Sequence, residues 1–507
     1  MPVRRLVASI LVFAGFGAAV HAQDPATADP RFVHVDRLSV KLAEGTGAEL
    51  VDGVLRSRSG VDLSRLQPLF AAGHAQPLVT AVPWDELDRW HRHACAVLPE
   101  HNRPGHLGLW FRLVGDSAAA TAALQSELRR EPLVTHADFE PVYALAAAPG
   151  ALAPPQDLPP TTPLFTSLQL THDPNPVGHG VRQAAGIFGA RGRDVKFVMM
   201  ENSFVLDHED VEQLVAANFL GPVPAYDPTF ALHGVSGAAI TCATRNGYGI
   251  TGVADEVTAR FMSLNLNGGV ENCLAMAVAD TQPGDVVMVV IIVQVPYLGP
   301  NSWVPFEIFQ SAFDATLTTT ALGRHVVVPA GNGNLSLDDP VFLNRFDRNF
   351  RDSGAIFVGA SQAGLMQRAT FANWGSRVDC HSWGDQVTSC GYSTLFFPNN
   401  DLRQSYTNGA SGTSASTPSL AGVVAMVQGA AKKQLGTTLS NAQMRDLLRM
   451  HGATTPDLIG PRSDVPAILQ ALGVFDGLSV DRADLQLLDT MTVTMSGAPG
   501  DLAALFA

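Results

Sequence analysis

Short, unbroken runs of apolar residues mark the second part of the chain. They lie at Val195–Met200, Val286–Val293, Val326–Ala330 and Ala355–Gly359, and helical or loop stretches separate them. A strand that is buried on both faces reads as a continuous apolar run, whereas a strand with one wet face alternates. The pattern therefore predicts an α/β domain with a doubly wound, mainly parallel sheet and helices on both faces.

The chain before these runs alternates between apolar and polar positions. Strand-like segments lie at Val33–Val35, Leu38–Val40, Leu107–Val114 and Leu133–Leu145. A stretch rich in alanine, leucine and glutamate, from Asp116 or Ser117 to Arg130, predicts a helix before the last of them. The combination predicts a small α+β domain.

The first 22 residues have the features of a secretory signal peptide. Arg4 and Arg5 precede an apolar run over Leu6–Val20, and a cleavage site follows at Val20-His21-Ala22. The run is too short to cross a membrane comfortably, and no later run is long and apolar enough. We therefore expect a secreted protein, extracellular or periplasmic, without a membrane span.

A stretch rich in alanine and proline separates the two predicted domains and indicates an extended linker. Towards the other end of the chain, Ser440-Asn-Ala-Gln443 has the form of a capping box that opens a helix reaching Met450. The expected segments are a signal peptide at 1–22, an α+β domain at 23–146, the linker at 147–163, the α/β domain at 164–475 and a C-terminal tail of unassigned role at 476–507.

The composition is that of a folded protein with an acidic surface. The chain has 507 residues, of which 46% are hydrophobic and 16% charged, and its formal net charge is −14. A chain of this length can bury a large core and carry an accessory domain. Because there is no basic run to neutralise phosphates, we expect no nucleic-acid partner.

Candidate chemistry begins where a polar, glycine-marked turn runs into an apolar helical segment over Asn408–Gln428. Ser414 lies at that junction. A hydroxyl there faces the unpaired N–H groups and the positive end of the helix dipole, where a developing negative charge is stabilised. The alternative is an ordinary N-cap serine, because serine favours such positions for structural reasons alone.

The residues around Ser414 resemble the nucleophile motif of the subtilisin-like serine proteases. Gly412-Thr-Ser-Ala-Ser-Thr-Pro418, with Ala421-Gly422, is similar to the family's Gly-Thr-Ser-Met-Ala-Thr-Pro and the Ala-Gly that follows it. The family's other blocks occur upstream in the order acid, histidine, oxyanion asparagine and serine. The resemblance also implies that the α+β domain is an inhibitory propeptide, an intramolecular inhibitor that makes the full chain a zymogen.

Two blocks would supply the acid and the base. His233-Gly234 and the segment through Val253-Ala254 resemble the family's His-Gly helix and the Gly-Val-Ala that follows it. Glu201 ends an apolar strand 32 residues earlier, at the position where the family has aspartate. The resemblance implies that Glu201 orients His233, and it makes Asp207 and Asp210 structural.

The third block, Val326-Val-Val-Pro-Ala-Gly-Asn-Gly-Asn334, resembles the strand that leads to the family's oxyanion asparagine. The match implies that Asn332 donates an amide N–H to the oxyanion, beside the Ser414 backbone N–H. Asp285–Val293 corresponds to the substrate-pairing strand. The bulky Ile291, Ile292 and Val293 replace its usual small residues, which alters the expected cleft.

The implied function is a secreted serine endopeptidase that acts on protein or peptide substrates. His233 would take the Ser414 proton, Ser414 would attack the peptide carbonyl, and water would resolve the acyl-enzyme. No cofactor is required for this chemistry. A structural calcium ion remains open, because Asn334–Asp339 is acidic but lacks the EF-hand pattern.

Three other function classes compete with this one. A subtilisin-like pseudoprotease that binds peptides without cutting them remains the main alternative, because Glu201 replaces the usual aspartate. An α/β-hydrolase esterase would need Gly-x-Ser-x-Gly, but Ser416 stands where the second glycine belongs, and the order of the triad is reversed. A metal-dependent hydrolase lacks any His-Glu-x-x-His or paired-cysteine motif.

The cysteines suggest disulfide bonds in an exported domain. Cys242, Cys273, Cys380 and Cys390 form an even set, and Cys95 stands apart in the α+β domain. Four cysteines allow three pairings. We predict Cys380–Cys390, which closes a short loop, and Cys242–Cys273; buried free thiols are the alternative.

Overall fold

A computed structural model describes residues 33–142, 161–295, 298, 301–474, 479–480 and 493–494. The expected signal peptide and linker residues 147–160 lie outside the described residues, as does most of the expected tail. Within the described part of the chain, no helix has the length and apolar character needed to span a membrane.

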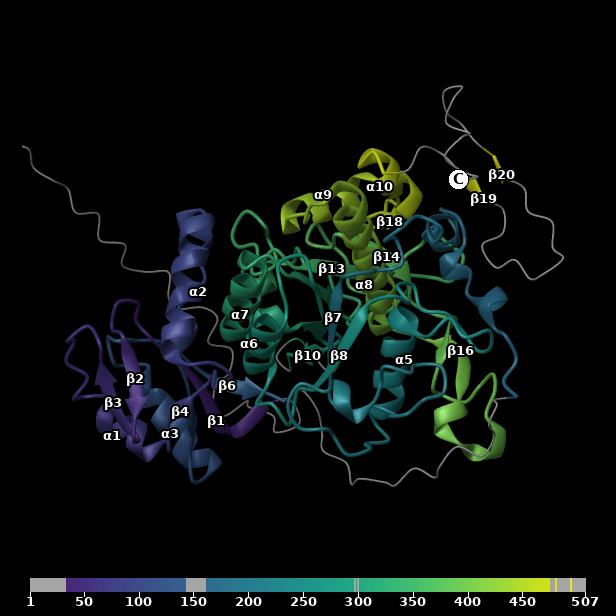
Figure 1. The fold of residues 1–507 in the computed structure, drawn as a ribbon. Coiled ribbons are helices and arrows are strands. Elements are labelled where there is room, and N and C mark those ends of the chain that lie inside the picture. The colour runs from purple at the N-terminus through teal and green to yellow at the C-terminus, as the bar shows by residue number, and fades with distance from the viewer. Residues whose placement is uncertain are drawn as a thin grey trace, which may run out of the picture.

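A six-stranded parallel sheet forms the centre of the larger domain (Figure 1). Its order is β14-β13-β12-β9-β7-β8. The strands are β7 (Lys196–Glu201), β8 (Thr258–Ser263), β9 (Val286–Val289), β12 (His325–Pro329), β13 (Ile356–Ser361) and β14 (Cys380–Trp383). The predicted α/β fold class is therefore confirmed. The four apolar runs are β7, β9, β12 and β13, whereas β8 and β14 were not predicted because polar residues interrupt them.

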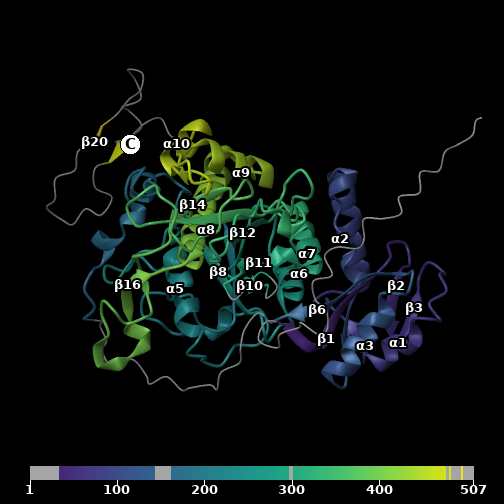
Figure 2. The same ribbon diagram turned by 180° about the vertical axis from the view of Figure 1, so that it is seen from behind.

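Helices cover both faces of this sheet (Figure 1, Figure 2). They are α4 (Val181–Ala184), α5 (Ala231–Cys242), α6 (Val270–Asp280), α7 (Gln310–Ala321), α8 (Thr413–Ala430), α9 (Asn441–Met450) and α10 (Val465–Ala471). The predicted capping box is present, because the Ser440 hydroxyl accepts the Gln443 N–H and the Gln443 side chain accepts the Ser440 N–H.

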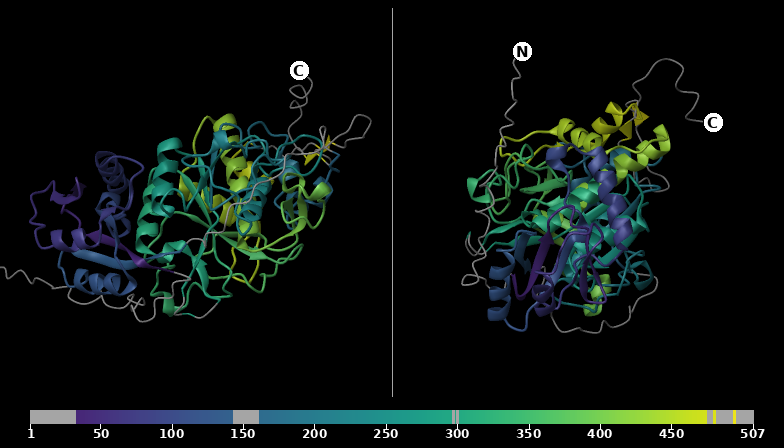
Figure 3. Two further views of the ribbon diagram at one scale, coloured as in Figure 1. Left: turned by 90° about the horizontal axis from the view of Figure 1, so that it is seen from below. Right: turned by 90° about the vertical axis from the view of Figure 1, so that its left-hand side faces the viewer.

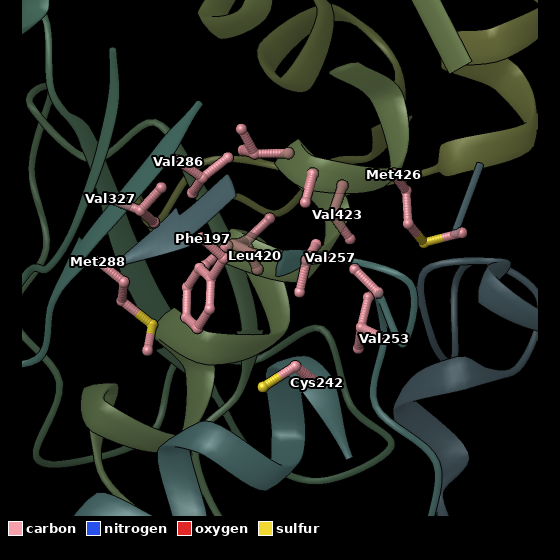
Figure 4. Close-up of a cluster of buried hydrophobic side chains, with 14 of the residues drawn as sticks. Phe197, Cys242, Val253, Val257, Val286, Met288, Val327, Leu420, Val423 and Met426 are labelled. Atoms are coloured by element: carbon pink, nitrogen blue, oxygen red, sulfur yellow. The ribbon is translucent and has the colours of Figure 1, made fainter. Parts of the chain in front are cut away.

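Two apolar cores lie on opposite faces of the sheet, and alternate strand residues enter one or the other. Phe197 of β7 and Met288 of β9 belong to the core that contains α5 and α8. Val198 and Val287, one residue along, belong to the core that contains α6 and α7. Figure 4 shows part of the first core, where Phe197 and Met288 lie among side chains of α8.

Short two-stranded ribbons surround the sheet. They pair β10 (Ile292–Gln294) with β11 (Trp303–Pro305), β15 (Val387–Cys390) with β16 (Tyr406–Ala410), β17 (Gly452–Ala453) with β18 (Arg462–Ser463), and β19 (Ser479–Val480) with β20 (Val493–Thr494). The expected substrate-pairing strand is shorter than predicted: β9 ends at Val289, and the chain forms β10 after a break.

The N-terminal part forms a separate α+β unit with its own core. Its antiparallel sheet has the order β4-β5-β1-β6. The elements are β1 (Val33–Leu42), β2 (Ala48–Val51), β3 (Val54–Ser57), α1 (Gln67–Ala72), β4 (Gln76–Pro77), α2 (Trp84–Val97), β5 (Trp110–Val114), α3 (Ala118–Leu128) and β6 (Val134–Pro141). The predicted helix is α3, which Ser117 caps by accepting the Ala120 N–H. The longer helix α2 was not predicted.

The N-terminal unit packs against α6 and α7, to one side of the sheet (Figure 1, Figure 2, Figure 3). Its apolar residues Trp90 and Trp110 belong to the same core cluster as α6. At the centre of the contact, the Asp314 carboxylate of α7 accepts the Gly105 N–H at 3.0 Å, the Trp110 indole N–H at 3.1 Å and the Lys41 ammonium at 3.4 Å. One buried carboxylate therefore joins three groups of the N-terminal unit to the larger domain.

The predicted disulfides are wrong. All five cysteines are free in the structure, and Cys242, Cys273, Cys380 and Cys390 are buried. Cys380 lies in β14 of the central sheet and Cys390 in β15 of a separate ribbon, so they do not close a common hairpin. Short sequence separation was a poor guide here, because the intervening residues connect two different sheets.

The Lys41–Asp314 ion pair gives a stability prediction. Burial opposes charge on both groups, but their mutual attraction outweighs it and holds the pKa of Lys41 above and that of Asp314 below the ordinary value. Removing Asp314 leaves the buried Lys41 ammonium with only the half-exposed Glu44 carboxylate, 3.1 Å away, and takes the acceptor from the buried Gly105 and Trp110 N–H groups. We expect Asp314→Ala to lower the free energy of unfolding by about 3–5 kcal/mol in urea titrations of a Ser414→Ala background.

The matched control is Arg65→Ala, which breaks a more exposed ion pair with Glu131 in the same N-terminal unit. It should change the free energy of unfolding by no more than about 1 kcal/mol. Equal losses for the two variants would contradict the role given to the buried pair.

Candidate active site

Four predicted site residues lie at or beyond strand ends and helix starts. Glu201 is the last residue of β7, and Asn332 follows β12 by three residues. His233 lies in the first turn of α5, and Ser414 in the first turn of α8. Parallel strands end at one edge of a sheet, where sites of α/β proteins form.

Glu201 and His233 are joined. The Glu201 side chain is fully buried, and its Oε2 pairs with Nδ1 of His233. The other carboxylate oxygen accepts the Asn202 backbone N–H at 2.7 Å. Because a carboxylate only accepts, Nδ1 of His233 carries the proton and Nε2 is left as an acceptor.

The same pairing sets the basicity of His233. Burial alone would lower the pKa of His233, and it is the largest single influence. The charge of Glu201 and the hydrogen bond to it outweigh burial, so the pKa of His233 is raised above its ordinary value. Glu201 therefore fixes the tautomer of the imidazole and also stabilises its protonated form.

Gly234 allows α5 to approach the chain that follows Glu201. A Cβ atom at position 234 would lie 2.1 Å from the Ser203 carbonyl oxygen, a distance that no side chain tolerates. This close approach gives the glycine of the His-Gly pair a steric reason.

The amide of Asn332 has a defined orientation. Its Oδ1 accepts the Thr413 backbone N–H at 2.9 Å and the Thr413 hydroxyl at 2.8 Å. The N–H can only donate, so the accepting atom must be the amide oxygen. The Nδ2 group of Asn332 therefore remains available to donate to another oxygen.

Gly412 lies beside both the Asn332 amide and the Ser414 hydroxyl. Its φ is +95°, and a Cβ atom there would lie 2.9 Å from Ser414 Oγ and 3.3 Å from Asn332 Nδ2. Both polar atoms therefore border the space above Gly412. Every other residue of α8 is buried, so Ser414 is the position at which this helix reaches solvent.

The structure does not join Ser414 to His233. The Ser414 hydroxyl donates to the Ser411 carbonyl at 3.5 Å, and it makes no hydrogen bond to the imidazole among the described residues. The helices that carry the two residues are nevertheless bonded, because the Thr241 hydroxyl of α5 donates to the Pro418 carbonyl of α8 at 3.0 Å. Long hydrogen bonds between nucleophile and base are common before substrate binds.

The rival acids have other partners. Asp210 is buried, accepts the Ile250 N–H at 2.6 Å and the Asn246 amide at 3.0 Å, and has a pKa raised by burial to about 8. Asp207 is exposed and adopts a φ of +56°. Neither residue contacts His233 among the described residues, and Glu201 does.

The acidic segment considered for calcium has protein partners. Asp338 accepts the N–H and the hydroxyl of Ser376, and Asp339 accepts the Val341 N–H. Across the residues that the structure describes, no three His, Cys, Asp or Glu side chains are grouped so that they could hold a metal ion.

Sequence reasoning missed Tyr392. The turn Gly391–Ser393 has three consecutive positive φ angles of 82°, 54° and 57°. A Cβ atom on Gly391 would lie 3.0 Å from the Leu232 carbonyl, so the turn packs against the start of α5. Tyr392 is 40% exposed; its partial burial, and then the charge of Glu201, raise its pKa to about 12. No pattern around this tyrosine indicated that it would lie within range of the Glu201 charge.

The family model described as Subtilase family matches residues 221–464. That range contains His233, Asn332 and Ser414, whereas Glu201 lies before it. Comparison with curated protein sequences gives no match.

Several solved structures are similar. Proteases from Pseudoalteromonas arctica are 19% identical, with 62% of this chain and 99% of that chain covered and a TM-score of 0.46. A lanthipeptide protease is 20% identical over 56% of this chain and 88% of that chain, with a TM-score of 0.41. A cold adapted subtilisin-like serine proteinase is 18% identical over 54% of this chain and 87% of that chain, with a TM-score of 0.39.

The contact around Gly412 gives a prediction that separates crowding from backbone strain. In Gly412→Ala the new methyl group would press on both Ser414 Oγ and Asn332 Nδ2. We expect kcat to fall about 10²-fold or more, because small displacements of reacting groups have effects of that size. The measurement is kcat beside the thermal unfolding midpoint.

Gly247→Ala is the matched control. Gly247 has a similar φ of +88°, but a Cβ atom there would meet nothing within 4 Å. It should show the backbone strain of a left-handed alanine without the loss of kcat. Equal kcat values for the two variants would rule out the crowding argument.

Proposed function

We propose that this chain, whose residues 221–464 match the subtilase family model, is a secreted serine endopeptidase that cuts peptide bonds in protein or peptide substrates. The observation that carries the proposal is that Ser414 Oγ and Asn332 Nδ2 both border the space above Gly412, while the buried Glu201 holds His233 on α5, the helix bonded to α8. Nucleophile, oxyanion donor and oriented base are the groups that acyl transfer needs.

In the proposed mechanism, Nε2 of His233 takes the proton of the Ser414 hydroxyl as Oγ attacks the peptide carbonyl carbon. The oxyanion accepts hydrogen bonds from Asn332 Nδ2 and from the Ser414 backbone N–H, which lies at the unpaired N-terminal end of α8. His233 then gives its proton to the leaving amine. Water, deprotonated by the same imidazole, releases the acyl group and restores Ser414.

Glu201 has an electrostatic role in this scheme. It keeps the proton of His233 on Nδ1, so that Nε2 faces the reaction, and it stabilises the imidazolium that forms. Because Glu201 already accepts a backbone N–H and pairs with His233, its charge has donors on both oxygens.

The N-terminal unit is proposed to be an inhibitory propeptide. It packs on α6 and α7 through the Asp314 contacts and a shared apolar core. Cleavage after export, at the proline-rich segment before Pro163, would separate the two domains. The competing proposal is a pseudoprotease, which the Ser414 hydroxyl favours by turning to Ser411 rather than to His233.

The first prediction for this function concerns Ser414. Ser414→Ala should abolish both fluorophosphonate labelling and casein hydrolysis, and N-terminal sequencing should show that the variant stays unprocessed if maturation is autocatalytic. The control is Ser440→Ala, which removes another serine at a helix start, where the hydroxyl caps α9. That variant should lose about 1 kcal/mol of stability but none of its activity.

Wild-type protein that is folded but neither labelled nor active would favour the pseudoprotease. A Ser414→Ala variant that cuts casein at the wild-type rate would sink the assignment of the nucleophile.

The second prediction concerns pH. His233 must be neutral to act as a base, so kcat/KM rises as pH rises through its pKa. Glu201 raises that pKa, and its charge is removed in Glu201→Gln. We expect the acid limb of the profile to move to lower pH and kcat to fall about 10²–10⁴-fold, because the amide favours the wrong tautomer.

The control is Asp207→Asn at the exposed rival acid, which should keep most of kcat and the wild-type profile. If Asp207→Asn loses activity while Glu201→Gln retains it, the proposed triad is wrong.

A further inference from the structure

Asn373 lies outside every motif discussed so far, yet its side chain touches both segments that flank the candidate oxyanion site. It is fully buried. Its Nδ2 donates to the Trp303 carbonyl at 2.8 Å and to the Ala330 carbonyl at 2.9 Å. Its Oδ1 accepts the N–H groups of Gly333 at 2.9 Å and of Leu335 at 3.0 Å.

These four bonds saturate the amide. A primary amide has two donors and two accepting lone pairs, and all are used on backbone groups. The orientation is fixed as well, because two of its partners are carbonyls and two are N–H groups. Neither aspartate nor leucine, which have a similar size, can reproduce this set of donors and acceptors.

The bonds lie on both sides of Asn332. The Asn373 backbone N–H donates to the Gly331 carbonyl at 3.0 Å, and the side chain accepts the Gly333 N–H. Gly331 has a φ of +101°, and a Cβ atom there would lie 2.4 Å from Asn373 Nδ2. The residues before and after Asn332 are therefore both held by residue 373, and Gly331 leaves the room that this contact needs.

The Asn373 amide also binds the β10–β11 ribbon to the candidate site. Trp303 begins β11, which pairs with β10, and β10 continues the chain beyond β9. In the sheet, β9 lies between β12 and β7, so this continuation runs between Asn332 and Glu201. Asn373 thus links the Asn332 loop to the β10–β11 ribbon.

We propose that Asn373 is a positioning residue, which holds the amide of Asn332 where the oxyanion forms. The proposal rests on the proposed protease function. Asn373 touches no reacting atom in this scheme, because its own hydrogen bonds all end on the backbone. It affects the reaction indirectly, because it fixes the position of Asn332 Nδ2 and also that of β11.

Kinetics of Asn373→Ala and the milder Asn373→Ser provide the test. With the loop released, kcat should fall about 10²-fold in the alanine variant and less in the serine variant, while KM changes less than kcat. Asn332→Ala should cost about 10²–10³-fold in the wild-type background. It should cost much less in either Asn373 background, where Nδ2 is already misplaced.

Gln169→Leu is the matched control. Gln169 is also buried and makes two side-chain hydrogen bonds to the Thr251 backbone, at 2.7 and 2.9 Å, in a segment that carries none of the proposed catalytic groups. It should lose stability but keep kcat, and the full cost of Asn332→Ala should persist in its background. A cost of Asn332→Ala that is the same in all backgrounds would overturn the proposal.

Hydrogen exchange keeps the proposal separate from the protease function. Amides of residues 331–335 should exchange at least tenfold faster in Asn373→Ser than in Gln169→Leu, whether or not the chain cuts peptides. An unchanged exchange rate would refute the clamp even in an active enzyme. If the wild-type protein is folded but cuts no peptide, and residues 331–335 still exchange faster in Asn373→Ser, the positioning role of Asn373 stands and the protease function is refuted.

Discussion

A buried carboxylate needs hydrogen-bond donors to replace water, and Glu201 has them at the end of β7. Its two oxygens are held by His233 and by the Asn202 N–H. The proposed base depends on this pair, because it decides which nitrogen of the imidazole is free.

The proposed nucleophile, Ser414, is placed by packing rather than by a hydrogen bond. The helix α8 is buried on all sides except at Ser414, and its residues form much of one core of the sheet. Rotation or sliding of this helix would expose apolar surface at about 25 cal/mol per Å². The hydroxyl can therefore turn from Ser411 to a substrate or an imidazole while its backbone stays in place.

Continuous apolar runs predicted four strands of the central sheet, because a strand buried on both faces is apolar at every position, which a single sequence shows. The strands β8 and β14 carry Arg260 and His381, so the same rule missed them. The blocks around Glu201, His233, Asn332 and Ser414 were found because each has a local glycine or strand signature. Asn373 has none, since its importance arises from four backbone groups that come together only in the folded chain. The disulfide prediction failed for a related reason, because neighbours in sequence belong to different sheets.

The buried thiols have a consequence for where the chain can fold. Burial raises the pKa of Cys242 to about 12 and raises the pKa values of Cys273, Cys380 and Cys390, so the nucleophilic thiolate is scarce at neutral pH. None of the four is bridged. The native packing of the larger domain therefore needs neither an oxidant nor a disulfide isomerase, and it is the same in a reducing as in an oxidising compartment.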